Sequence, residues 1–198
     1  MYLALYQNPT SPTDSAEEPN LFEHLSVASL ERSLENGDVD IALGFDSSLK
    51  TPNYLCSRRL FDETMACVVR KDHPEIGEEV SLEQYVHMDH VSVSMSSRQG
   101  GIVDDWLAER GLERRVTLKI PHFLVAPFIV AQTDMVLSVP RRLAKQFVHL
   151  APLKIVAPPM KLPMNQVIMV WHRQDDKEPA CAWLREQVQT VSEAAIES

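Results

Sequence analysis

Apolar residues follow two different periods along this chain, one typical of buried strands and one typical of helices. The run 39–45 (VDIALGF) is apolar on both sides of an extended chain, as a strand covered on both faces would be. Before it, apolar residues from Val27 to Leu34 recur at helical spacing, and Gly37 is expected to end that helix. A helix followed by a buried strand is the repeating unit of α/β proteins.

The same alternation continues to the end of the chain. Strands are predicted at 1–7, 21–25, 39–45, 54–61, 65–70, 90–94, 116–120, 135–139, 153–157 and 166–171. Helical segments are predicted at 26–36, 82–85, 102–110, 121–132, 141–147 and from 179 onward. Proline-rich segments at 8–20 and 158–163 are predicted to be loops. This order predicts open α/β sheets, which bind ligands at the carboxyl ends of their strands.

Size and charge narrow the possible functions. The chain has 198 residues, which suits one compact unit or two lobes of roughly 100 residues each. Apolar residues make up 44% and charged residues 24%, so the chain can bury a core. Its net charge of -9 would repel nucleic acid at long range. We therefore expect that this chain does not bind DNA by itself.

The cysteines and the lengths of the apolar runs indicate where in the cell the protein is located. Cys56, Cys67 and Cys181 are odd in number and far apart, which favours a reducing environment over a disulfide framework. Residues 1–7 lack the basic start and the cleavage site of a signal peptide. No run approaches the ~20 apolar residues of a membrane span. The prediction is a cytoplasmic protein with no membrane partner.

Four strings in a fixed order carry a family resemblance. They are LERSLENGDVDIALGF (30–45), RRLFDETMACVVRKDHP (58–74), VTLKIPHFLVAPFIVAQTDMVLSVPRRLA (116–144) and VWHRQDDKEPACAWLREQV (170–188). Together they resemble the effector-binding domain of LysR-type transcriptional regulators. The last two are similar in particular to the branch that contains nodulation and aromatic-degradation regulators.

The resemblance implies a fold and a set of partners. The implied fold is α/β and periplasmic-binding-protein-like (type 2), with two α/β lobes, two crossover strands and a ligand cleft between the lobes. Lobe one is expected at 1–75 plus 168–198, and lobe two at 76–167. The family's winged helix-turn-helix is absent from this chain, so DNA would be contacted only through that missing N-terminal domain. The resemblance also implies a homodimer or higher homo-oligomer.

The segment between the predicted strand 90–94 and the next helix is rich in hydroxyl groups and glycine. Serine hydroxyls and free N–H groups at the start of a helix can hold a carboxylate, and an arginine can add positive charge. The alternative is an ordinary polar loop, with the arginine in solvent. The candidate ligand-binding residues here are Ser94, Ser96, Ser97 and Arg98.

A second candidate group begins where the predicted strand 116–120 ends. His122 could hydrogen-bond an acidic effector while Phe123 packs against an aromatic ring. The alternative for His122 is a core histidine bonded to backbone groups. Phe123 and Phe128 are expected to be shared between the core and the ligand site.

The expected lobe one supplies three further candidates. Phe45 and Asp46 follow the strand 39–45 and would face the cleft if the lobe has the expected topology. Trp171 ends the predicted return strand and could form a wall of the pocket. For Trp171, packing within the lobe is an equally good interpretation.

Metal binding and catalysis are weaker hypotheses. His87 and His90 are three positions apart, but no third ligand is obvious and the segment leads into a strand. No paired carboxylates or nucleophile–base pair stand out, so we expect no enzyme and no cofactor. The sequence therefore predicts a sensor of a small, aromatic or acidic metabolite. The alternative is a solute-binding protein for transport on the same fold, which the absent signal peptide and the unpaired cysteines disfavour.

Overall fold

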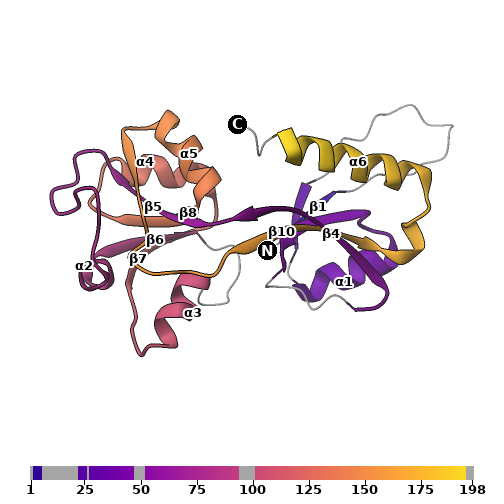
Figure 1. Cartoon of the computed structure of the whole chain (residues 1–198), viewed down its shortest axis with the longest axis horizontal. Helices are drawn as coiled ribbons and strands as arrows, with labels where there is room; N and C mark the ends of the chain where they lie inside the picture. The colour runs from indigo at the N-terminus through magenta and orange to yellow at the C-terminus, as the bar shows by residue number, and fades with distance from the viewer. Residues whose placement is uncertain (1, 6–21, 26, 47–51, 94–100, 195–198) are drawn as a thin grey trace. The chain divides into compact units, whose positions relative to one another are not determined.

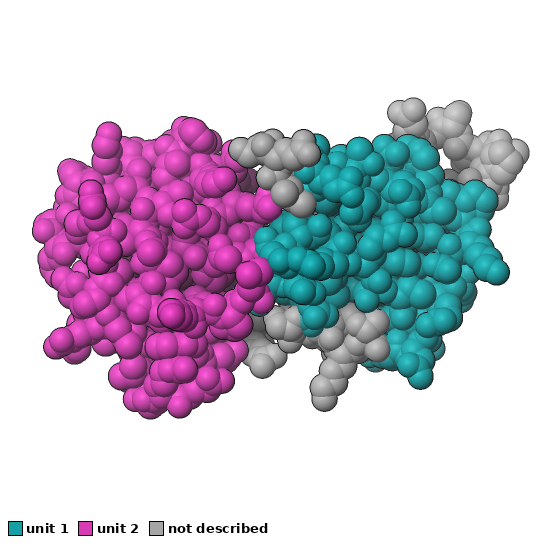
Figure 2. Space-filling model, viewed as in Figure 1, with its two compact units in different colours: residues 1–62, 165–198 teal, residues 63–164 magenta. Residues whose placement is uncertain are grey.

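The computed structural model describes residues 2–5, 22–25, 27–46, 52–93 and 101–194. The chain divides into two compact units, which Figure 2 shows in different colours. Unit 1 comprises Met1–Asp62 and Asn165–Ser198, and unit 2 comprises Glu63–Met164. The chain therefore passes from one unit to the other twice.

Unit 1 is built on a five-stranded sheet of order β2-β1-β3-β10-β4. The strands are β1 (Tyr2–Leu5), β2 (Phe22–Leu25), β3 (Ile41–Phe45), β4 (Leu55–Glu63) and β10 (Asn165–His172). Strand β1 runs antiparallel to both β2 and β3, and β3 runs antiparallel to β10. The central strand β3 therefore has antiparallel neighbours on both sides.

Helices cover both faces of this sheet, α1 (Val27–Asn36) on one and α6 (Pro179–Ala194) on the other (Figure 1). The α1 face buries Leu30 and Leu34 against residues of β3 and β10. Gly37, with a φ of 74°, ends α1 in the left-handed conformation that glycine tolerates, as the sequence predicted. A short 3₁₀ helix, η3 (Arg173–Asp175), connects β10 towards α6.

Unit 2 has a second five-stranded sheet, of order β7-β6-β8-β5-β9. Its strands are β5 (Met65–Arg70), β6 (Asp89–Val93), β7 (Arg115–Ile120), β8 (Val136–Pro140) and β9 (Leu153–Val156). Strand β6 is parallel to both β7 and β8, whereas β5 is antiparallel to both β8 and β9. Three neighbouring strands, β7, β6 and β8, thus point in the same direction.

The helices of unit 2 also lie on both faces of their sheet (Figure 1). One face carries α2 (Leu82–His87) and α3 (Ile102–Ala108); the other carries η2 (Phe123–Val125), α4 (Ala126–Val130) and α5 (Arg141–Leu150). Two separate core clusters result. Tyr85 and Leu107 belong to the first and Phe147 to the second. Because both faces are covered, the inner strands β5 and β8 carry apolar residues on both sides.

Two expectations from the sequence need correction. The single helix predicted at 121–132 is a 3₁₀ turn, η2, followed by the five-residue α4. Pro127 lies at the start of α4, where its missing N–H group is tolerated, so the regular helix begins late. The structure also places the first unit boundary between Asp62 and Glu63 rather than near residue 75. The reason is that β5 pairs with β8 and β9, both of which belong to unit 2.

Candidate functional site

The carboxyl ends of three parallel strands lie at one edge of the unit 2 sheet. Val93, which ends β6, is paired with Ile120, which ends β7. Strand β8 is parallel to β6 in the same sheet and ends at Pro140. Segments that follow such strand ends are the usual ligand-binding positions of open α/β sheets. We call this line of strand ends, which runs across the sheet and is not an edge strand, the carboxyl edge of unit 2.

The start of β5 lies at the same edge, because Met65 is paired with Pro140. The Arg141 N–H group donates to the Thr64 carbonyl over 2.7 Å, which joins the start of α5 to this strand. Glu63 is buried and its Oε1 accepts the Thr64 N–H group at 2.9 Å. Arg142 Nε lies 3.7 Å from the other carboxylate oxygen, Glu63 Oε2. The carboxyl edge therefore contains a buried carboxylate next to a partly exposed guanidinium group.

Neither Glu63 nor Arg142 was predicted from the sequence to be a ligand-binding residue. The signal that could have found Arg142 is the Pro-Arg-Arg string directly after the predicted strand 135–139. Glu63 gave no such signal, because it is 79 positions before Arg142 and only the sheet pairing brings the two together.

His122 and Phe123 follow the end of β7. His122 is exposed and has an extended backbone at the start of η2, where its side chain makes no capping hydrogen bond. The alternative of a core histidine is therefore wrong for this residue. Phe123 is half-buried and packs against the core cluster of α4 and α5. The segment after β7 thus has an exposed imidazole followed in sequence by a partly buried aromatic residue.

Phe128 lies on the outer surface of α4 rather than in the core. It is 51% exposed, and the neighbouring Leu124 and Val125 are 72% and 48% exposed. Large apolar side chains that gather on a surface mark sites where something else binds. The sequence expected Phe128 to be shared between the core and a ligand site, and its position leaves its ring available on the surface.

The three candidate ligand-binding residues of unit 1 differ from one another in burial. Phe45 is half-buried and Asp46 is exposed at the end of β3. Both neighbours of β3 are antiparallel, so the argument from parallel strand ends does not apply there. Trp171 is 5% exposed in a core cluster, and its indole N–H group donates to Asp176 over 3.1 Å. Packing within the unit, which was the alternative for Trp171, describes its environment.

The remaining candidates, Ser94, Ser96, Ser97 and Arg98, lie outside the described residues. The described chain stops at Val93, which ends β6, and resumes at Gly101, which precedes α3. The role of these four residues in ligand binding therefore remains a prediction.

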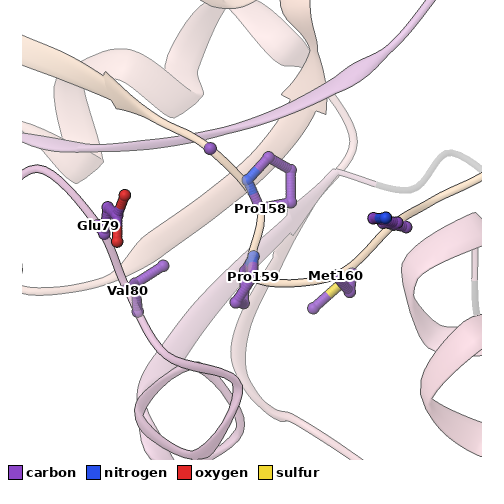
Figure 3. Close-up of a pocket in the computed structure, with 7 residues that line it drawn as sticks. Glu79, Val80, Pro158, Pro159 and Met160 are labelled. Atoms are coloured by element: carbon purple, nitrogen blue, oxygen red, sulfur yellow. The ribbon is translucent and has the colours of Figure 1, made fainter.

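A pocket of about 300 Å³ opens elsewhere on unit 2 (Figure 3). None of the residues selected from the sequence lines it. Val80 and Met160 are buried residues that also belong to the α2 and α3 core cluster. The full lining is Glu79, Val80, Ala157, Pro158, Pro159, Met160 and Lys161. Its walls are mainly apolar, and few polar groups converge that could orient a ligand.

The cysteines and histidines of the described chain are not arranged for nucleophilic or metal chemistry. Burial raises the pKa of the Cys67 thiol to about 11 and that of the Cys181 thiol to about 12, so both are protonated at neutral pH. His90 is fully buried, and its Nε2 atom lies 2.6 Å from the Tyr85 carbonyl. His87 is exposed on α2. Within the described ranges, no three ligand-type side chains gather as a metal site would require.

The two units, each a sheet covered by helices on both faces, define a periplasmic-binding-protein-like fold of the second type. A family model described as the LysR substrate binding domain matches residues 16–193. This chain belongs to that family and is a LysR-type effector-binding domain.

Several named relatives are similar to this chain. The transcriptional activator NagR of Ralstonia sp is 35% identical over 170 residues, which are 85% of this chain and 56% of that protein. The transcriptional activator NahR of Pseudomonas putida is 35% identical and covers 81% of this chain and 53% of its own length. Nodulation protein D 1 of Neorhizobium galegae is 33% identical, with shares of 77% and 49%. The chain thus spans about half the length of these relatives, and they confirm the branch indicated by the sequence.

Solved structures agree with this assignment. The probable transcriptional regulator PA0477 of Pseudomonas aeruginosa superposes with a TM-score of 0.74 at 30% identity and covers 85% of this chain and 53% of its own. The regulatory domain of MexT, a transcriptional activator of the same species, gives a TM-score of 0.69 at 23% identity, with shares of 81% and 76%. The second likeness concerns the fold alone. Both neighbours are transcriptional regulators rather than transport proteins.

Among the described residues, no helix is both long enough and apolar enough to cross a bilayer.

Proposed function

We propose that this chain binds a small aromatic carboxylate at the carboxyl edge of unit 2 and thereby controls a LysR-type regulator. The observation that carries the proposal is the shared edge of β7, β6 and β8, with His122 exposed directly after β7. Open α/β sheets bind ligands at such edges. Arg142, whose Nε atom lies 3.7 Å from Glu63 Oε2, provides a partly exposed guanidinium group next to the same strand ends.

The chemistry of the edge favours an aromatic acid. An imidazole can donate a hydrogen bond to a carboxylate, and such charge-assisted bonds are the stronger ones. Phe123 and the exposed Phe128 offer aromatic surface close to His122 in sequence. Ser94, Ser96, Ser97 and Arg98 remain proposed ligand residues, whereas the described strands of unit 1 give Phe45 and Asp46 no support from parallel strand ends. We omit Trp171, because its ring is used in the core.

The relatives are named transcriptional activators or regulators, which supports a sensor rather than an enzyme. A ligand that binds one conformation better than another shifts the population towards it. In the proposed regulator, this shift would act on a DNA-binding domain. We propose that the protein works in the cytoplasm as a homodimer or larger homo-oligomer.

Calorimetric titration with salicylate, benzoate and a non-aromatic acid tests the proposal. We expect salicylate to bind and His122→Ala to weaken it about 10- to 100-fold, which corresponds to the loss of one charge-assisted hydrogen bond. His149→Ala is the matched control, since His149 is also exposed but lies near the end of α5. Absence of binding by any aromatic acid, or equal losses in both variants, would contradict the proposal.

A further inference from the structure

Arg114 is a buried cation at the junction between α3 and β7. Its side chain is 6% exposed, although arginine is rarely buried in proteins. Both its Nε and Nη2 atoms donate to Asp104, over 2.7 Å and 2.9 Å to the two carboxylate oxygens. This is the bidentate arrangement that fixes the orientation of both groups.

Asp104 has a second partner at the start of α3. Its Oδ2 atom accepts the Gly101 N–H group at 3.1 Å. Gly101 is the N-cap residue and has no side chain, so it cannot cap the helix itself. Asp104 is at the N3 position, and its carboxylate therefore accepts the N-cap amide as the N3 side chain of a capping box does. Because Arg114 holds that carboxylate, it acts on Gly101 through Asp104.

The third contact of Arg114 leads to the middle of the sheet. Its Nη1 atom donates to the Tyr85 hydroxyl over 3.4 Å, and that hydroxyl lies 2.7 Å from Ser138 Oγ on β8. Arginine cannot accept a hydrogen bond, so the phenol oxygen accepts from Arg114, and either hydroxyl can be the donor between Tyr85 and Ser138. Burial raises the pKa of Tyr85 to about 12, which keeps the phenol protonated in this role. The chain of bonds thus ties α3 to α2 and to the central strand.

A buried ion pair is a weak source of stability, because removing two charges from water costs about as much as their attraction returns. The contacts of Arg114 instead define a geometry: α3 begins at Ile102, after the segment that follows β6 in the chain, and β7 begins directly after Arg114. We propose that Arg114 is a positioning residue that fixes the start of α3 through Asp104 and so maintains the ligand-binding geometry of the carboxyl edge. The link between Arg114 and the ligand-binding geometry rests on the proposed function.

Amide hydrogen exchange of the whole chain, measured residue by residue by NMR, tests the positioning role without any ligand. The amides to follow are those of Gly101, bonded to Asp104, and Asp105, bonded to the Gly101 carbonyl over 2.9 Å. In Arg114→Gln we expect both to exchange at least about 10-fold faster, as the loss of one local hydrogen-bonded constraint implies. Asp104→Asn should give the same increase, and the double variant should add no more.

Two further variants separate positioning from general destabilisation. Arg114→Lys keeps the charge but loses the bidentate geometry, so it should fold and give an intermediate exchange rate. Phe147→Leu weakens the core on the opposite face of the sheet and serves as the control for lost global stability. If the two amides exchange no faster in the Arg114 variants than in Phe147→Leu at equal stability, the positioning role is wrong.

Salicylate titration of the same proteins tests the link to the effector site. We expect the affinity to fall about 10-fold in Arg114→Gln and to stay within twofold of the unsubstituted chain in Phe147→Leu. An equal affinity in both variants would overturn the link to the site. If the unsubstituted chain does not bind salicylate or the other acids, the proposed function fails, while the exchange rates still decide the role of Arg114.

Discussion

Phe147→Ala is expected to lower the free energy of unfolding of unit 2 by about 3–5 kcal/mol, the range for removing a buried phenylalanine. Phe147 is 1% exposed on α5 and packs with residues of α4, β5 and β8. Its removal leaves a cavity between α5 and the sheet, which the close-packed neighbours can fill only in part. Urea unfolding followed by circular dichroism measures the loss.

Phe128→Ala is the matched control, because the same side chain is removed from a surface where it is 51% exposed. We expect it to cost well under half as much stability as Phe147→Ala and, on the proposed function, to weaken binding of an aromatic acid. A loss of stability equal to that of Phe147→Ala would contradict the placement of α4. The pair therefore separates the role of an aromatic ring in folding from a role in binding.

Stability is expected to fall as the pH is lowered from about 6.5 to about 4, because of His90. Burial lowers the pKa of His90 from 6.5 to about 4, although the Tyr85 carbonyl, Asp104 and Asp89 oppose the shift; Arg114 adds to it. In this window the unfolded chain takes up a proton at His90 that the folded chain does not. The unfolded state is therefore favoured by up to ~3 kcal/mol at the acid end, at 1.4 kcal/mol for each unit of pKa difference.

His90→Gln should remove most of that dependence while keeping an N–H donor for the Tyr85 carbonyl. The measurement is the urea unfolding free energy at several pH values between 4 and 7, compared with His149→Gln, which replaces an exposed histidine. The slope should flatten only in His90→Gln. A slope that is the same in both variants would show that His90 does not remain neutral in the folded protein.

The local features of the fold could be predicted from the sequence. Gly37 ends α1 with a φ of 74°, as its position after the apolar stripe predicted. The alternation in 116–120 correctly indicated a strand, β7, whose side chains are alternately exposed and half-buried. Such features depend on neighbours in sequence, and this is why pattern and glycine position are sufficient to predict them.

Features that depend on distant partners could not be predicted in this way. The family resemblance implied that residues 65–70 belong to lobe one, and a strand pattern does not say which strands it pairs with. In the structure β5 lies between β8 and β9. The roles of Glu63 and Arg114 likewise depend on contacts that the fold creates. Trp171 was equally compatible with a pocket and with a core until its burial beside Asp176 was known.

His122 remains a prediction as a ligand-binding residue, and what supports it is its exposed position after β7. The candidates Ser94, Ser96, Ser97 and Arg98 rest on the same reasoning, since they follow β6 in the chain as His122 follows β7. The argument did not extend to Phe45 and Asp46, because the strand pattern alone did not reveal that β3 has antiparallel neighbours.

Mapping of salicylate by NMR chemical shifts tests the central claim most directly. If the carboxyl edge of unit 2 binds the acid, the amide signals that move in proportion to saturation will be those of Ile120, His122, Phe123 and Arg141. Signals at the opposite ends of the same strands, such as those of Asp89 and Arg115, will stay in place. Shifts confined to the pocket around Val80 and Met160, or no saturable shifts at all, would contradict the account.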